Sequence, residues 1–225
     1  MKNLLYCMLI FTIALVQGCK KKDAEPEEAM APTPTVAEHL NSAAYVQLKI
    51  GNYWIYQEIN VDSQGNETPT ISYDSCYIVS DSLIRGSKFF KLKNFSPLFS
   101  YQNLLRDSSN HIINSHGEII FSANDFTTIF ANNFVVDPQS PADTIEKAIS
   151  KMTDKDLSII VPAGTFTTSN FQKKYNIHPN WAQGVPLRYM NTRFAKNIGM
   201  ITQTQPLFLS MTSSVERKLV RYHLN

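Results

Sequence analysis

The sequence predicts an all-β domain, built as an antiparallel meander sheet with little helix. Three features of the region from Tyr45 to Asn225 lead to this prediction. Short runs of aromatic and β-branched residues are separated by clusters of Gly, Asn, Asp, Ser and Pro, as expected for successive strands and turns. Within the runs, side chains alternate with the two-residue period of a strand. The connections are a few residues long, so strands adjacent in sequence should be neighbours in the sheet.

The first two strands are predicted at residues 53–61 and 71–79. In the first of them, apolar positions such as Ile55 alternate with a second face that begins at Trp54. Between the two strands, residues 62–66 read Asp-Ser-Gln-Gly-Asn. These residue types tolerate left-handed backbone angles, so the segment is expected to turn the chain back on itself.

Further strands are expected at residues 88–92, 101–106, 111–114, 118–122, 157–161, 165–168, 172–177, 187–194, 199–204 and 215–224. Residues 161–164, with Pro second and Gly fourth, have the pattern of a type I turn. Phe166 and Phe171 are five positions apart, which places them on opposite faces of an unbroken strand. If both are buried on one face, a bulge near residues 169–170 has to shift the phase.

Two segments are harder to assign. Residues 125–141 are aromatic in their first half and turn-like in their second, and we interpret them as an irregular crossing between two groups of strands. Residues 145–152 have apolar positions at helical spacing and a capping residue at Asp143, which favour a helix. A turn at 153–156 that leads into the β-rich segment 157–161 favours a strand instead. We predict the strand.

The N-terminus has the pattern of a signal peptide at residues 1–18. A basic start at Lys2 precedes an apolar run over 4–16, and Gly18 precedes Cys19. The run is shorter than the roughly 20 residues that span a bilayer. This pattern resembles the lipobox of bacterial lipoproteins, which implies that Cys19 becomes the first mature residue and carries the lipid. The alternative is a secreted protein that is cleaved elsewhere.

Residues 19–44 are predicted to form a lipidated, disordered tether, because they contain charge, Pro and Ala but no aromatic residue. The three acyl chains implied for Cys19 would anchor the protein permanently, since each buried CH₂ contributes about 0.8 kcal/mol. The run Lys20 to Lys22, followed by acidic residues, resembles the charged segments of surface-exposed lipoproteins of the Bacteroidota. That resemblance implies attachment to the outer membrane, with exposure at the cell surface as a further implication.

Residues 45–225 suffice for a single domain, and three of their motifs resemble a known group. The motifs are Gly-Asn-Tyr-Trp-Ile-Tyr at 51–56, Val-Pro-Ala-Gly-Thr-Phe at 161–166 and Phe-Ala-Lys-Asn-Ile-Gly at 194–199. They are similar to those of uncharacterised all-β outer-membrane lipoproteins of Bacteroidota. The resemblance implies an antiparallel sheet curved into a half-barrel or open clam. It implies no activity, and Cys19 is the only functional residue it carries over.

Several kinds of chemistry lack a sequence signal. No histidine has a second ligand at metal-site spacing, and no nucleotide-binding glycine loop or G-x-S-x-G motif is present. We therefore expect no metal and no cofactor. Asp154 and Asp156 are interpreted as turn formers. Cys76 is the one thiol left in the mature, lipidated chain, and a half-buried inert thiol is favoured over a reactive one. Basic residues are scattered and the formal net charge is +2, which does not favour nucleic acid as a partner.

The large amphipathic rings are the candidate ligand-binding residues, namely Trp181, Tyr175 and Tyr189. Trp181 lies in the polar loop 178–186 and is expected to be the most exposed large aromatic residue of the domain. It either contacts a partner or folds back to plug one end of the sheet. Trp54 lies in a predicted strand and is interpreted as a core residue.

These observations favour a lipid-anchored β domain of the cell envelope that binds a ligand or a partner protein, with no catalysis evident. Its membrane contact would be the lipid anchor. One alternative is a carrier that encloses a lipid or another apolar molecule in a cavity of the curved sheet. The other is a hydrolase with an unrecognised site, which would need a polar cleft where an acid, a base or a nucleophile meet.

Replacement of Cys19 by Ser is expected to release the protein from membranes, because the tether alone has no apolar surface to insert. Detergent phase partitioning of native and Cys19→Ser protein measures this change. A variant that stays in the detergent phase would contradict the assignment of Cys19 as the anchor.

Overall fold

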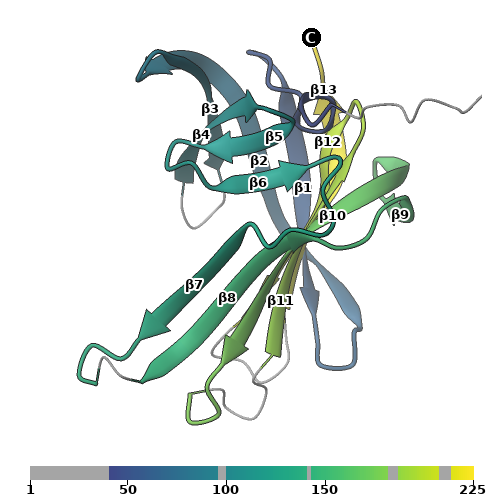
Figure 1. Ribbon diagram of the computed structural model, residues 1–225. Helices are drawn as coiled ribbons and strands as arrows, with labels where there is room; N and C mark the ends of the chain where they lie inside the picture. Colours follow the sequence, from purple (N-terminus) through teal and green to yellow (C-terminus); the bar gives the residue numbers. More distant parts are fainter. Residues whose placement is uncertain (1–40, 96–99, 141–142, 182–186, 208–213) are drawn as a thin grey trace, which may run out of the picture. The chain divides into compact units, whose positions relative to one another are not determined.

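The computed structural model describes residues 41–95, 100–140, 143–181, 187–207 and 214–225 (Figure 1). The predicted signal peptide, Cys19 and most of the predicted tether lie outside these residues. The elements are α1 (Ala43–Val46), β1 (Tyr53–Val61), β2 (Glu67–Ile84), β3 (Ser87–Phe95), β4 (Ser100–Ser108), β5 (His111–Asn114), β6 (Ile119–Ser122), β7 (Ala131–Val136), β8 (Thr144–Met152), β9 (Leu157–Val161), β10 (Gly164–Ile177), β11 (Leu187–Ala195), β12 (Gly199–Pro206) and β13 (Ser214–His223).

These strands form one 13-stranded antiparallel sheet in the order β6-β5-β4-β3-β2-β1-β13-β12-β11-β10-β8-β7, and β9 pairs with β10 off this path. Most neighbours in the sheet are also neighbours in the chain, as the short connections predicted. The pairing of β1 with β13 joins the first strand to the last. The sheet curves strongly, and β6 and β7 are the first and last strands of this order (Figure 1). The predicted all-β half-barrel is therefore confirmed.

Two strands are longer than predicted. The return strand expected at 71–79 is the 18-residue β2, which ends only at the two-residue turn Arg85-Gly86. Both turn residues have left-handed backbone angles, with φ of 50° and 76°, and such turns match the twist of the flanking strands. The two strands expected at 165–168 and 172–177 form one 14-residue strand, β10.

From the sequence, a bulge near residues 169–170 was expected if Phe166 and Phe171 were buried on one face. No such bulge is present in β10. The pairing of β10 with β11 runs without a shift from Thr168 to Asn176. Phe171 belongs to one core cluster, whereas the partly buried Phe166 packs against another. Because the two rings face different clusters, no phase shift is needed to bury them. The partner of β10 on its other side changes from β9 to β8 between Thr168 and Phe171.

Of the two segments that were hard to assign from the sequence, one was predicted correctly and the other only in part. Residues Thr144–Met152 form β8, so the strand prediction is correct. The interpretation of 125–141 as an irregular crossing is wrong in part, because the segment contains β7, which pairs with β8. This strand lies at the edge of the sheet and most of its residues are exposed. It therefore has no alternating buried face, and Asn132 and Asn133 further weaken its strand signal.

Ordered structure begins before Tyr45, where the domain was predicted to start. Ala43 and Ala44, which the sequence assigned to the tether, belong to α1. Ser42 is completely buried, and its hydroxyl donates to the Asn110 carbonyl and accepts a hydrogen bond from the Ala123 N–H at 2.9 Å. These bonds attach the start of the domain to the region of β4–β6. Among the described residues, no helix is long and apolar enough to cross a bilayer.

Buried apolar side chains form two clusters in the domain. One cluster joins α1 to strands β4, β5, β6, β8, β10 and β11. The other joins β1, β2, β9, β11, β12 and β13 and contains Trp54, Tyr56 and Cys76. Trp54 is 3% exposed, which confirms it as a core residue. Cys76 is fully buried, and burial raises its thiol pKa to about 12. The raised pKa keeps the thiol protonated, and the residue is buried more deeply than expected.

Gly199 allows the turn before β12 to approach the Trp54 ring. The indole Nε1 donates to the Ile198 carbonyl at 2.7 Å, and the Tyr56 hydroxyl donates to the Met200 carbonyl at 3.0 Å. Gly199 has a φ of +116°, and a Cβ placed there would lie 2.8 Å from Trp54 Nε1. The position therefore excludes side chains both by backbone conformation and by contact.

Gly199→Ala is expected to destabilise the fold by about 2–5 kcal/mol, because left-handed strain of about 1–2 kcal/mol adds to overpacking of about 1–3 kcal/mol. Gly86→Ala is the matched control, since Gly86 has a φ of +76° but no atom within 4 Å of an added Cβ. Chemical denaturation of the mature chain measures both. Equal losses in the two variants would show that the contact with Trp54 has no energetic weight.

Candidate functional site

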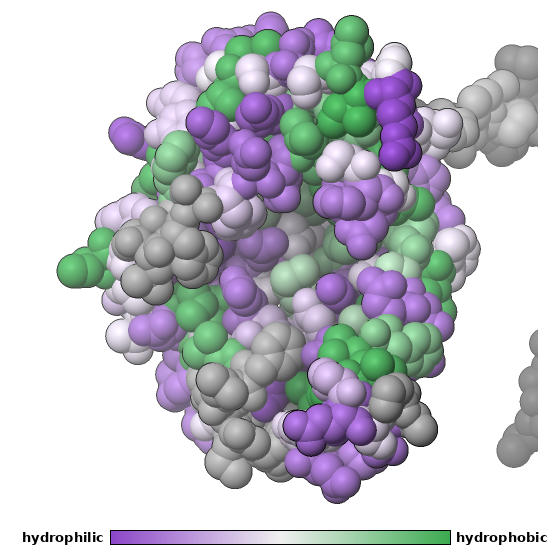
Figure 2. All heavy atoms as spheres, turned by 90° about the vertical axis from the view of Figure 1, so that its left-hand side faces the viewer, coloured by the Kyte–Doolittle hydropathy of each residue, from purple (hydrophilic) through white to green (hydrophobic). Residues whose placement is uncertain are grey.

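The concave face of the sheet contains a cavity of about 210 Å³. Its apolar walls include Trp54, Leu105, Phe171 and Phe194, and a polar end is formed around Arg217. The lining comes from α1 and from strands of both halves of the sheet. In the view from the side of β6 and β7, the surface is hollowed near its centre and hydrophilic residues border much of the hollow (Figure 2). The walls of the cavity are mainly apolar.

The register of the strands decides which side chains face the cavity. Phe171 pairs with Thr192 in the β10–β11 ladder, and cross-strand partners point to the same face of a sheet. Phe171, Thr192 and Met190 all line the cavity. The alternating residues Gln172 and Asn191 therefore lie on the convex face. The same alternation assigns the other candidate residues to one face or the other.

The predicted binding residues do not form one site. Tyr175 pairs with Arg188 and lies on the concave face, but it does not line the cavity. Tyr189 pairs with Lys174 and therefore lies on the convex face. Trp181 follows β10 and is 52% exposed, so its indole does not plug the sheet. The remainder of its loop, residues 182–186, lies outside the described residues.

Trp181 was also expected to be the most exposed large aromatic residue, and this expectation is wrong. Phe134 is 56% exposed. Phe134 lies on the edge strand β7, which the sequence did not identify. Because edge strands have one neighbour only, their side chains are covered less than those of central strands.

A buried ion pair forms the polar end of the cavity. Arg217 Nε lies 2.6 Å from Asp74 Oδ2, and the two side chains are only 7% and 6% exposed. Arg217 Nη1 donates to Gln203 Oε1 at 3.1 Å. The guanidinium also lies over the Tyr56 ring, 4.9 Å from its centroid. Side chains of β1, β2 and β12 thus hold the arginine of β13 in place.

A second carboxyl group, that of Glu58, lies beside this pair. Glu58 is the register partner of Arg217, and it lines a smaller cavity of about 50 Å³ together with Asp74, Arg217 and Tyr101. Burial raises the pKa of Glu58, and the negative charge of Asp74 raises it further. Burial also raises the pKa of Asp74, although Arg217 opposes this effect. The two cavities share Tyr101 and Arg217 and are therefore adjacent.

Only one of the two carboxylate oxygens of Asp74 has a charged partner in this arrangement. Its Oδ2 forms the ion pair with Arg217, whereas its buried Oδ1 has no donor among the described residues, except the Glu58 carboxyl when that group is protonated. A buried acceptor without a donor is unfavourable. The polar end of the cavity therefore presents an acceptor that a hydrogen-bond donor would satisfy.

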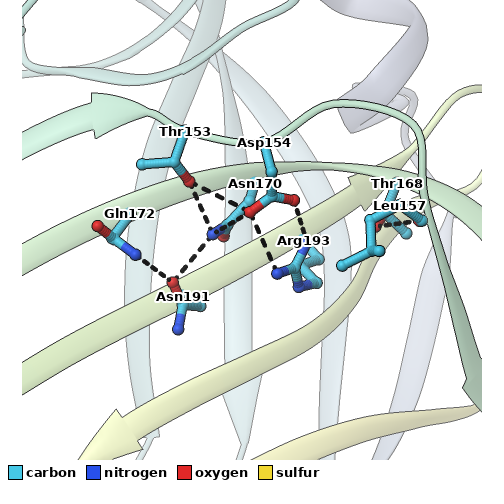
Figure 3. Close-up of polar contacts among 8 residues, drawn as sticks. All are labelled: Thr153, Asp154, Leu157, Thr168, Asn170, Gln172, Asn191 and Arg193. Atoms are coloured by element: carbon cyan, nitrogen blue, oxygen red, sulfur yellow. Dashed lines mark hydrogen bonds and ion pairs between the residues drawn. The ribbon is translucent and has the colours of Figure 1, made fainter. Parts of the chain in front are cut away.

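A different polar cluster lies on the convex face (Figure 3). Asp154 accepts from Arg193 Nη1 at 2.5 Å and from Asn170 Nδ2 at 3.2 Å. The fully buried Asn170 also donates to Thr153 Oγ1 at 3.0 Å and to Asn191 Oδ1 at 2.9 Å. Burial raises the pKa of Asp154, but hydrogen bonds and the charge of Arg193 outweigh it and hold the pKa below its usual range.

This convex cluster is structural. It attaches the loop between β8 and β9 to β10 and β11, and its hydrogen bonds join side chains of the same domain. Asp156 has a φ of +61°, as expected of a turn former. Asp154 does more than form a turn, because it pairs with a strand residue 39 positions away. The sequence did not indicate that partner.

The described histidines and acids do not suggest a metal centre. Among the residues that the structure describes, no three His, Cys, Asp or Glu side chains are grouped so that they could hold a metal ion. His111 Nδ1 lies 2.9 Å from the Ser109 carbonyl, and its ring meets Phe130 edge-on. These contacts give His111 a local packing role.

Sequence reasoning missed Glu58, Asp74 and Arg217 as site residues. β13 contains a weak signal. Val215, Arg217 and Leu219 are spaced two residues apart, so their side chains point to the same face of the strand. A charged residue flanked in this way on an inward face needs a buried partner. The partner lies more than a hundred residues earlier in the chain, so the sequence alone did not identify it.

No protein-family model and no curated protein matches the chain. Among solved structures, the chain is similar to a presumed exported protein with a YmcC-like fold from Bacteroides fragilis, with a TM-score of 0.47 and 12% identity, over 80% of this chain and 98% of that one. It is also similar to a presumed lipoprotein from Parabacteroides distasonis, with a TM-score of 0.43 and 13% identity, over 80% and 99% of the two chains. At these sequence identities and TM-scores, no property of either protein can be assigned to this chain.

Arg217→Met is expected to destabilise the fold by about 3–5 kcal/mol, because it leaves the Asp74 carboxylate buried without its cation. Combining it with Asp74→Leu should recover most of the loss. Asp81→Asn is the control, since the Asp81–Lys88 pair is 35% and 58% exposed and such pairs contribute at most about 1 kcal/mol. Chemical denaturation measures all three. Equal losses for Arg217→Met and Asp81→Asn would contradict the role assigned to the buried pair.

Proposed function

We propose that this chain is a lipid-anchored domain of the cell envelope that binds a small, largely apolar ligand inside its curved sheet. Cys19 would attach it to the outer membrane, and residues 20–40 would let the domain stand clear of the lipid head groups. The observation that carries this proposal is the cavity of about 210 Å³ with apolar walls and one polar end. Concave apolar cavities with few polar groups are the usual form of small-molecule sites.

The volume of the cavity limits the size of the ligand. An apolar protein cavity of about 150 Å³ can bind benzene. A cavity of about 210 Å³ therefore holds a compact group slightly larger than one aromatic ring. A complete two-chain lipid does not fit inside it. The carrier considered from the sequence would therefore hold a small molecule, or one small apolar part of a larger molecule.

The hydrolase alternative has one observation in its favour. Glu58 and Asp74 are two acids with raised pKa values in a cleft, and such groups are frequent in active sites. However, Arg217 already neutralises Asp74, and no histidine lines the described part of either cavity. Cys76 lines the larger cavity, but its thiol is protonated. Binding without catalysis is therefore the better supported function.

Calorimetric titration of the mature chain with benzyl alcohol tests this proposal. A saturable isotherm with one site per chain is expected. Met190→Trp should weaken binding at least about tenfold, because Met190 lines the cavity and a larger ring would fill part of it. Leu187→Trp is the matched control, since Leu187 lies on the same strand but is 40% exposed and does not line the cavity.

Trp54 provides an independent measure of where the probe binds. The chain contains two tryptophans, so Trp181→Phe leaves Trp54 as the only one. Because Trp54 lines the cavity, its emission should change with the same midpoint as the heat of binding. Absence of a saturable signal, or equal binding by native and Met190→Trp protein, would refute the proposal.

A further inference from the structure

The polar end of the cavity has more negative than positive side chains. Glu58, Asp74 and Arg217 line the smaller cavity, and Arg217 is the one charged residue that lines the larger cavity among the described residues. With all three groups ionised, two negative charges face one positive charge. Tyr101 lines both cavities and is neutral. When both carboxyl groups are ionised, the charge of these three side chains therefore favours a cation over an anion.

Arg217 is not available to bind an anionic ligand. Its Nε lies 2.6 Å from Asp74 Oδ2, its Nη1 donates to Gln203, and its guanidinium carbon lies over the Tyr56 ring. An incoming carboxylate would have to displace Asp74 and would also meet the Glu58 carboxyl group. Both neighbours would repel it at short range, where little water is present to screen the charges.

Asp74 provides the acceptor for a cationic donor. Its side chain is 6% exposed and lines the smaller cavity, and its Oδ1 has no donor in the described residues other than a protonated Glu58 carboxyl. A ligand N–H group placed there would satisfy Oδ1 and would separate the two carboxyl groups. Hydrogen bonds between an ionised donor and a carboxylate are stronger than neutral ones.

We infer that the cavity selects ligands with a protonated amine joined to a compact apolar body, with the ammonium between Glu58 and Asp74. The inference rests on the proposed function and names the class of ligand. The apolar body would lie against Leu105 and Phe171 in the larger cavity. The Tyr101 ring, which lines both cavities, is available for a cation–π contact.

The test compares three probes that share one ring and differ in their polar group. Benzylamine is a cation at neutral pH, benzyl alcohol is neutral and benzoate is an anion. The mature chain is titrated with each by calorimetry in the same buffer and salt. We expect benzylamine to bind at least about tenfold more tightly than benzyl alcohol, and benzoate to bind more weakly than both. Benzyl alcohol reports the apolar contribution, so the ratios isolate the effect of charge.

Glu58→Gln removes one carboxylate while it retains the shape of the side chain. The ratio of the affinity for benzylamine to the affinity for benzyl alcohol should fall about tenfold. Glu216→Gln is the matched control, because Glu216 precedes Arg217 in β13 and so points to the opposite face of the sheet. It should change neither affinity. Asp74 is left intact, since Arg217 depends on it.

The possible outcomes separate this inference from the proposed function. If benzylamine and benzyl alcohol bind equally, or if benzoate binds most tightly, the inference is overturned and the cavity remains a binding site. If none of the three probes binds, both fail. The comparison of probes on the native chain decides the matter even if Glu58→Gln does not fold, and circular dichroism of each variant shows whether it does.

Discussion

The antiparallel pairing of β1 with β13 is the constraint on which the rest of the structure depends. Strands β1–β6 form one meander and β10–β13 form another, and the ladder from Tyr53 and His223 to Val61 and Ser214 is where they join. The cavity takes its walls from both meanders. The ion pair at its polar end connects Asp74 of β2 with Arg217 of β13 across the intervening strand β1. Without this join, neither the walls nor the polar end would assemble.

Much of the fold follows from local sequence patterns. The alternation at Tyr53–Val61 identifies β1 with its observed bounds, and the Pro-Ala pair after Val161 marks the turn between β9 and β10. Such signals are local, because a turn or a two-residue period involves residues that are close in the chain. The edge strand β7 has no buried face and therefore no such signal. The continuity of β10 depends on the strands that flank it, which its own residues do not specify.

The candidate site is less accessible to sequence reasoning for the same reason. Glu58, Asp74 and Arg217 come from three strands, and no motif relates their spacing. Tyr175 and Tyr189 have the residue type of a binding site, yet the strand register places them on opposite faces. Residue type thus suggests that a side chain can bind, whereas pairing and curvature decide whether it meets a cavity. The prediction that Cys19 is lipidated differs, because it rests on a contiguous pattern that can be recognised in the linear chain.

The position of β13 has a consequence for how the domain is made. The last strand of the chain lies in the middle of the sheet, between β1 and β12. A chain that emerges from its N-terminus can form the hairpins of each meander as they appear, but β1 keeps an open edge until Ser214–His223 arrives. Pairings between the two ends of a chain close large loops and are slow to form. The sheet of this domain is therefore complete only after Ser214–His223 has been synthesised.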